Sequence, residues 1–220
     1  MFIDFNLIIQ SLPALLRGSL LTLQIAFCGG ILGVSLGTLL ALLQISQFKV
    51  VRWIVGFYVG IIRGTPMLIQ VTIAFYVLPQ LGLALPALWA AILAIGLNSA
   101  AYVSQTIRSG INAVGKGQIE AAYVLGFTHI QTLRYIVLPQ AFKLVLPALG
   151  NEFITLVKDS SLASIIGVAE LTREGSLIRS RTFDALSIYA AVALIYLLIT
   201  TLLTFGVAYL EKRMNKHARH

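Results

Sequence analysis

One run of residues constrains this chain more than any other. Residues 20–43 are apolar except for Gln24 and a few hydroxyl side chains. A helix of about 20 apolar residues crosses the roughly 30 Å hydrocarbon core of a bilayer. The rest of the chain is similar, with 58% hydrophobic and 11% charged residues and a mean hydropathy of +0.91. The sequence therefore predicts an all-α integral membrane protein in one domain, residues 1–220.

Glycines four residues apart mark one face of this first segment. Gly29, Gly33 and Gly37 leave a flat stripe on which a second helix can pack closely. Residues 1–18 have no cationic region before their apolar part and no small-residue cleavage signature, so we expect a retained first transmembrane helix and not a signal peptide. The one cysteine, Cys28, excludes an intramolecular disulfide framework and cysteine-based zinc clusters.

Four further spans are expected. The second apolar stretch is interrupted at Arg63, Gly64, Thr65 and Pro66, where Thr65 before Pro66 is typical of a helix end followed by a new start. We therefore expect a short interfacial helix, a break, and a span over about residues 66–78. The other spans are predicted at about residues 86–107, 136–157 and 185–210, with a mostly polar segment at 158–184.

The distribution of basic residues orients these five spans. Lys and Arg gather in alternate connections and in the tail, which are the segments expected in the cytoplasm. These residues are Lys49, Arg52, Arg108, Lys116, Arg134, Lys212, Arg213, Lys216 and Arg219. The N-terminus is predicted outside and the C-terminus inside. Topology thus accounts for most of the net charge of +8 without a nucleic-acid partner.

A helix, glycine, helix unit stands out in the largest predicted cytoplasmic loop, about residues 116–138. Gly126 suits the left-handed conformation that ends a helix, and Thr128 with Gln131 forms a capping-box start for the next one. A DNA-binding helix-turn-helix shares this outline, but here the second helix leads straight into a membrane span. A capped loop without a partner is the other interpretation of the pattern.

This loop carries a family resemblance. The stretch "EAAYVLGFTHIQTLRYIVLPQA" is similar to the EAA loop of permease subunits of bacterial ABC importers, with Glu120, Ala121, Ala122 and Gly126 at the matching positions. The stretches "RGTP", "NSAAY", "LPALGNEFITLVKDSSLAS" and "ELTREG" resemble the histidine, glutamine, arginine and cystine importer group. The likeness covers nearly the whole chain.

The resemblance implies a MetI-like, type I permease fold in the bacterial inner membrane. It also implies a second permease subunit, an extracytoplasmic amino acid binding protein, and separate ATPase subunits that dock on Glu120, Ala121, Ala122 and Gly126. This chain would be a transport subunit and not an enzyme. The stretch "GINAVGK" has the glycine and lysine spacing of a phosphate-binding loop. It is followed by Gly117 where Ser or Thr is needed, and it comes after a membrane helix and not after a strand. We therefore expect no cofactor here, with ATP and magnesium bound by the partner.

Polar residues within the spans indicate where a substrate could bind, because they are costly in a membrane unless they face a cavity or a partner. They fall on two helical faces. The first face holds Asn98, Tyr102, Gln105 and Ser109, and the second holds Glu152, Thr155 and Asp159. The two carboxylates could accept an ammonium or guanidinium group, or they could pair with Lys158 or nearby arginines, or cap helix ends.

Two carboxylates on one face favour arginine, lysine or histidine as cargo, with glutamine as the next candidate. Arg63 could meet the substrate carboxylate or extend its side chain to the membrane surface. Two rival functions stay open. One is a self-sufficient secondary transporter that uses Glu152 or Asp159 for proton coupling, although no second helix break is found. The other is a membrane assembly or receptor subunit that does not transport.

Overall fold

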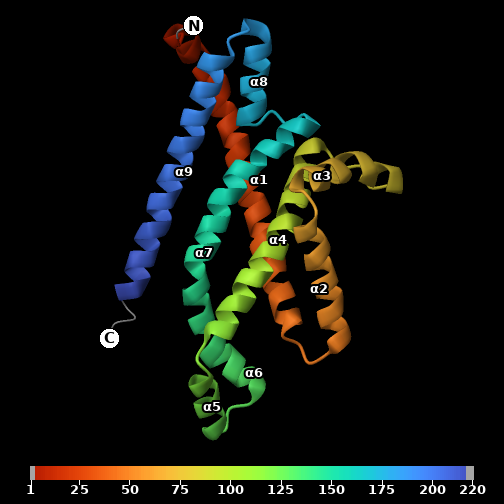
Figure 1. Ribbon diagram of the computed structural model, residues 1–220, viewed down its shortest axis with the longest axis vertical. Coiled ribbons are helices and arrows are strands. Elements are labelled where there is room, and N and C mark those ends of the chain that lie inside the picture. The colour runs from red at the N-terminus through yellow and green to blue at the C-terminus, as the bar shows by residue number, and fades with distance from the viewer. Residues whose placement is uncertain (1–2, 217–220) are drawn as a thin grey trace.

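The computed structural model describes residues 3–216, and all its regular structure within that range is helical (Figure 1). Arg219, one of the predicted basic tail residues, lies outside the described residues. The long helices are α1 (Phe5–Gln44), α2 (Lys49–Gly64), α4 (Ala87–Ala113), α7 (Leu138–Asp159) and α9 (Ala185–Lys216). Shorter ones are α3 (Met67–Thr72), α5 (Lys116–Val124), α6 (His129–Thr132) and α8 (Leu171–Thr182). Two π-helical segments, η1 (Ile73–Val77) and η3 (Leu133–Val137), and two 3-10 segments, η2 (Leu78–Leu81) and η4 (Ser160–Ile166), complete the chain.

Helix α1 begins earlier than the apolar run predicted. Asp4 is its N-cap, and an Oδ1 atom of Asp4 accepts a 3.0 Å hydrogen bond from the backbone N–H of Leu7. This satisfies one of the unpaired donors of the first turn. The helix then continues through Pro13 and Arg17, which the expected span at residues 20–43 had left out.

Helices α1 and α4 pack against each other through the glycine stripe. A Cβ atom added at Gly33 would lie 2.5 Å from the Ser99 Oγ, and one added at Gly37 would lie 2.7 Å from the Val103 side chain. Both distances are shorter than van der Waals contact, so only glycine permits this separation of the two helices. The packing role predicted for the stripe is confirmed.

The break predicted at Thr65 and Pro66 is confirmed. The axes of the pair Lys49–Gly64 and Met67–Leu81 differ by 104°. Helix α2 lies alongside α4, and α3 with the segment after it runs across the end of α4 (Figure 1). The assignment of residues 66–78 as a span, with a short interfacial helix before the break, stays a prediction.

Length and apolarity qualify three helices of residues 3–216 as membrane spans, α1, α4 and α9, or four if the bent pair counts as one. Helix α7 is not among them, although it is close to the span predicted at residues 136–157. It carries Lys143, Glu152, Lys158 and Asp159, so its composition is less apolar than that of a lipid-facing helix. Helix α7 packs against α1, α4 and α9, and Glu152 and Asp159 are partly buried there, whereas Lys143 and Lys158 are exposed.

The two ends of the molecule differ in what they present. Helices α5 and α6 lie at one end, and α8 lies at the other, beside the start of α1 and the start of α9 (Figure 1). Helix α8 belongs to the predicted polar segment at residues 158–184. The chain passes from α6 through η3 into α7 without a break, as the sequence predicted for the second helix of the loop.

A buried glutamate fixes α8 to the long helices. Glu170 is the N-cap of α8 and is fully buried. Its carboxylate accepts hydrogen bonds from the backbone N–H groups of Thr172 and Arg173, at 3.0 and 2.8 Å. It also accepts the hydroxyls of Tyr196 on α9, at 2.9 Å, and Thr22 on α1, at 3.3 Å. One carboxylate therefore joins three helices.

The glycine contact predicts a loss of stability for Gly33→Leu. The new side chain must push α1 away from Ser99, and such overpacking costs about 1–3 kcal/mol. Gly206→Leu is the control, because no atom lies within 4 Å of a Cβ added there. Thermal unfolding of the purified protein in detergent should show a lower midpoint for Gly33→Leu only. Equal midpoints for the two variants would contradict the close contact.

The Glu170 network predicts that Glu170→Ala loosens α8. Removal of the carboxylate leaves two backbone N–H groups and the Tyr196 hydroxyl without their acceptor, which should cost about 2–3 kcal/mol. Trypsin should then cut after Arg173 or Arg179 in α8 much faster than in the parent protein. Glu174→Ala, in the first turn of the same helix, is the control and should leave the cleavage rate unchanged.

Candidate functional site

A cavity of about 370 Å³ lies between the α2–α3 break, α4 and α7. Five of the six residues predicted to bind substrate line it. The full lining is Thr65, Pro66, Met67, Asn98, Tyr102, Glu152, Thr155 and Asp159. The two polar faces that the sequence placed on separate helices thus meet at the helix break, and the break supplies the third wall.

Gln70 positions the break against α4, and sequence reasoning missed it. Its side-chain amide donates to the carbonyl of Ile62 at 2.8 Å and to the Thr65 hydroxyl at 2.9 Å. Its side-chain oxygen accepts a 2.9 Å hydrogen bond from the Asn98 amide. A polar residue in the apolar stretch directly after the break was the available signal. Gln70 occupies carbonyls that the broken helix leaves free, and it fixes the orientation of Asn98.

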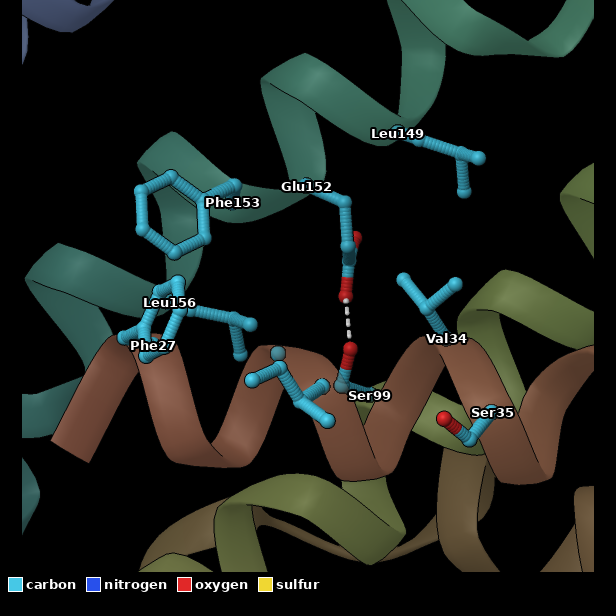
Figure 2. A pocket seen from close by; sticks show the side chains of 10 residues that line it. Phe27, Val34, Ser35, Ser99, Leu149, Glu152, Phe153 and Leu156 are labelled. Carbon is cyan, nitrogen blue, oxygen red and sulfur yellow. Dashed lines mark hydrogen bonds between the residues drawn. The ribbon is translucent and has the colours of Figure 1, made fainter.

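Glu152 lies between this cavity and a second one. Its Oε1 accepts a 3.1 Å hydrogen bond from the Ser99 hydroxyl of α4. On the other side is a mainly apolar cavity of about 410 Å³ between α1 and α7, and Figure 2 shows Glu152 pointing across it to Ser99. Phe27, Val34 and Phe153 are among its lining residues. The position of the carboxylate therefore depends on the packing of α1, α4 and α7 together.

The two carboxylates of the polar cavity have no basic partner. Among the described residues, no Lys or Arg nitrogen lies within 4.0 Å of Glu152 or Asp159. Asp159 precedes η4 but its side chain makes no capping hydrogen bond there. Neither the ion pairs nor the capping roles considered from the sequence are formed. A cavity with two unpaired carboxylates is suited to an ammonium or guanidinium group.

Two side chains beside the carboxylates make contacts with the protein itself. The Arg63 guanidinium lies over the Tyr102 ring, 5.2 Å from its centroid, so this arginine packs against the cavity wall as a cation–π partner. The Thr155 hydroxyl donates to the Asn151 carbonyl of its own helix at 3.1 Å.

Gln105 does not line this cavity, in contrast to the prediction. Its amide donates to the Gln44 side-chain oxygen at 3.0 Å, in a separate pocket toward the far end of α4. The helical repeat placed Gln105 one turn from Tyr102 on the same face. The face is correct, but the cavity is shorter than the polar stripe and ends before Gln105.

The loop at residues 116–138 has the predicted capped structure. Gly126 has φ of +84°, and the Phe127 N–H bonds to the Ala122 carbonyl at 3.0 Å, which completes the helix-ending motif. Both hydrogen bonds of the capping box between Thr128 and Gln131 are formed. The Tyr123 hydroxyl and the His129 Nδ1, 3.0 Å apart, hold the two helices together. The loop is therefore a preformed unit.

The outer surface of this loop is more apolar than the motif alone suggested. Glu120 and Ala121 are exposed, whereas Ala122 is 3% exposed and packs inward, so Ala122 supports the loop from within. Three large apolar side chains project from the surface, Val124 (87% exposed), Leu125 (76%) and Ile130 (75%). Exposed large apolar side chains such as these are available for contact with another protein or with a membrane.

Comparison with known proteins agrees with this geometry. Residues 33–216 match the family of binding-protein-dependent transport system inner membrane components. The chain is 40% identical to the arginine transport system permease protein ArtQ of Bacillus subtilis, over 99% of this chain and 100% of ArtQ. It is 37% identical to the glutamine transport system permease protein GlnP of Escherichia coli, over 96% and 97% of the two chains.

Solved structures show the same fold. A chain of an amino acid ABC transporter crystallised with histidines matches with a TM-score of 0.92 and 39% identity, over 97% of this chain and 100% of that chain. The MetNI methionine ABC transporter matches in fold, with a TM-score of 0.77 and 23% identity, over 92% of this chain and 97% of that one. The chain thus belongs to the inner membrane components of binding-protein-dependent transport systems, in the group of amino acid ABC transporter permeases.

Proposed function

We propose that this permease carries basic amino acids, arginine, lysine or histidine, through the cavity that holds Glu152 and Asp159. The observation that carries the proposal is that both carboxylates line one cavity without a basic partner. One carboxylate suits the α-ammonium group that every amino acid has, and the second suits a basic side chain. The names of the arginine permease and of the transporter crystallised with histidines support this choice. Glutamine, named for another relative, is the alternative cargo.

The rival functions lose support from the family. A binding-protein-dependent system relies on other proteins, which argues against a self-sufficient secondary transporter and against a membrane subunit that does not transport. In addition, residues 3–216 contain one bent helix pair, whereas an inverted-repeat transporter would be expected to have two broken helices in corresponding positions.

The proposed complex contains two permease subunits and two separate ATPase subunits that bind ATP and magnesium. Each permease would have five spans, with α7 as the fourth, the N-terminus outside and α5 and α6 in the cytoplasm. The loop surface around Glu120, Val124 and Leu125 would dock on the ATPase. ATP binding would close the ATPase subunits, and hydrolysis would reset the outward-open state. An extracytoplasmic binding protein would deliver the amino acid to the end that carries α8.

Cargo selection by Glu152 is tested with Glu152→Gln. Loss of one charge-assisted contact should reduce uptake of arginine by about tenfold or more. Glutamine uptake should change much less, because glutamine has no basic side chain. Uptake of both labelled amino acids is measured with the reconstituted complex, and Glu211→Gln on α9, outside the cavity, is the control. Equal losses for the two amino acids would contradict a role in selectivity.

Docking of the ATPase is tested with Glu120→Lys and Gly126→Trp. The first reverses an exposed charge. The second replaces a residue at φ of +84°, which a side chain adopts only with strain. Both variants should recover several-fold less ATPase on affinity purification and should lose uptake. Glu174→Lys makes the same charge change on α8 and should recover the normal amount. Unchanged recovery with Glu120→Lys and Gly126→Trp would refute docking at this loop.

A further inference from the structure

A pocket of about 390 Å³ between α1, α2 and α4 has no role in the proposed transport route. Its lining is Gln44, Arg52, Gly56, Val59, Gly60, Gln105 and Arg108. Among the described residues, no carboxylate lies within 4.0 Å of Arg52 or Arg108. The pocket therefore contains two guanidinium groups and two carboxamides. No acidic side chain neutralises the two guanidinium charges.

Both arginines are held in place but keep most of their donors free. The Arg108 Nη1 donates to the Gln44 side-chain oxygen at 3.3 Å, and that oxygen also accepts from Gln105. Gln44 is 6% exposed, so it is a fixed support. The Arg52 Nη1 donates to the Ser46 carbonyl at 3.3 Å. Since a guanidinium has five N–H donors, each arginine can still bind an anion through two of them.

The pocket lies where three helices reach the same end of the molecule. Gln44 is the last residue of α1, Arg52 is in the first turn of α2, and Arg108 is in the last two turns of α4. In the proposed orientation, on which this inference rests, that end faces the cytoplasm. With about 1.5 Å of rise per residue, these helix ends lie at the depth of the lipid headgroups and not within the hydrocarbon core.

The exposed side of α2, the helix that carries Arg52, is an apolar surface. Trp53 and Phe57 are stacked, with ring centroids 5.7 Å apart, and they are 69% and 59% exposed. Tryptophan is enriched at the boundary between lipid and water. Gly56 and Gly60 leave the mouth of the pocket open, since no atom lies within 4 Å of a Cβ added at either.

We propose that this pocket binds the phosphate of an anionic phospholipid of the cytoplasmic leaflet, with Arg52 and Arg108 as its ligands. Basic pockets between transmembrane helices on the cytoplasmic side bind such headgroups, and guanidinium groups match the geometry of a phosphate. The acyl chains then lie along Trp53 and Phe57. The bound lipid links the start of α2 to the end of α4. Helix α2 ends at the break, and α4 contributes Asn98 and Tyr102 to the cavity.

The test is native mass spectrometry of the purified transporter complex with phosphatidylglycerol or phosphatidylcholine that carry identical acyl chains. The parent complex should bind phosphatidylglycerol more tightly. Arg52→Gln with Arg108→Gln should weaken that binding by about tenfold to thirtyfold and leave phosphatidylcholine binding unchanged. Arg179→Gln with Arg181→Gln removes the same charge at the opposite end and should have no effect. Equal losses in both double variants, or no preference in the parent complex, would overturn the proposal.

A second variant separates the site from a general effect of charge or folding. Gly60→Leu keeps both arginines but fills the open mouth, so it should also weaken phosphatidylglycerol binding. Inorganic phosphate in place of lipid tests for a free-anion site, and its binding at the same affinity would overturn the lipid assignment. If the complex with Arg52→Gln and Arg108→Gln contains fewer permease copies than the parent complex, the pocket lies at an interface between subunits. That result would also overturn the lipid assignment. Because no transport is measured, these results do not depend on the identity of the cargo.

Discussion

The close contact between α1 and α4 is the interaction on which the rest of the structure depends. Glycine at position 33 lets the Ser99 hydroxyl occupy the space between the two helices, and Ser99 in turn holds the Glu152 carboxylate of α7. In lipid there is no hydrophobic driving force for helices to associate. Small residues let the helices approach closely, and the resulting van der Waals packing stabilises the pair. The packing motif of the first helix and the charge of the candidate site are therefore parts of one arrangement.

The break between α2 and α3 makes the polar cavity possible. A broken helix leaves backbone carbonyls without their usual partners, and within a membrane such groups are tolerated only when protein satisfies them or they line a cavity. The Gln70 amide donates a hydrogen bond to the carbonyl of Ile62, and the Gln70 side-chain oxygen accepts one from Asn98. The polar cavity is thus built from the same residues that stabilise the break.

Much of this architecture could be predicted from the sequence, and the exceptions have clear causes. Three features follow from local rules that depend only on residue type and spacing. They are the glycine stripe, the break at Thr65 and Pro66, and the capped loop at Gly126 and Thr128. The position of Gln105 outside the cavity and the 104° bend at the break depend on where a cavity ends and how helices tilt. Those are tertiary properties, and helical periodicity contains no information about them.

The path from the loop to the cavity is one uninterrupted helical course, from His129 through η3 to Asp159. Each residue added to a helix turns everything beyond it by about 100°. A one-residue insertion between the loop and Glu152 would therefore rotate the carboxylate away from Ser99, even if every contact of the loop surface were kept. The length of this stretch is restricted more strictly than its composition. Side chains on this stretch that face neither the loop contacts nor the cavity can vary more readily than its spacing can.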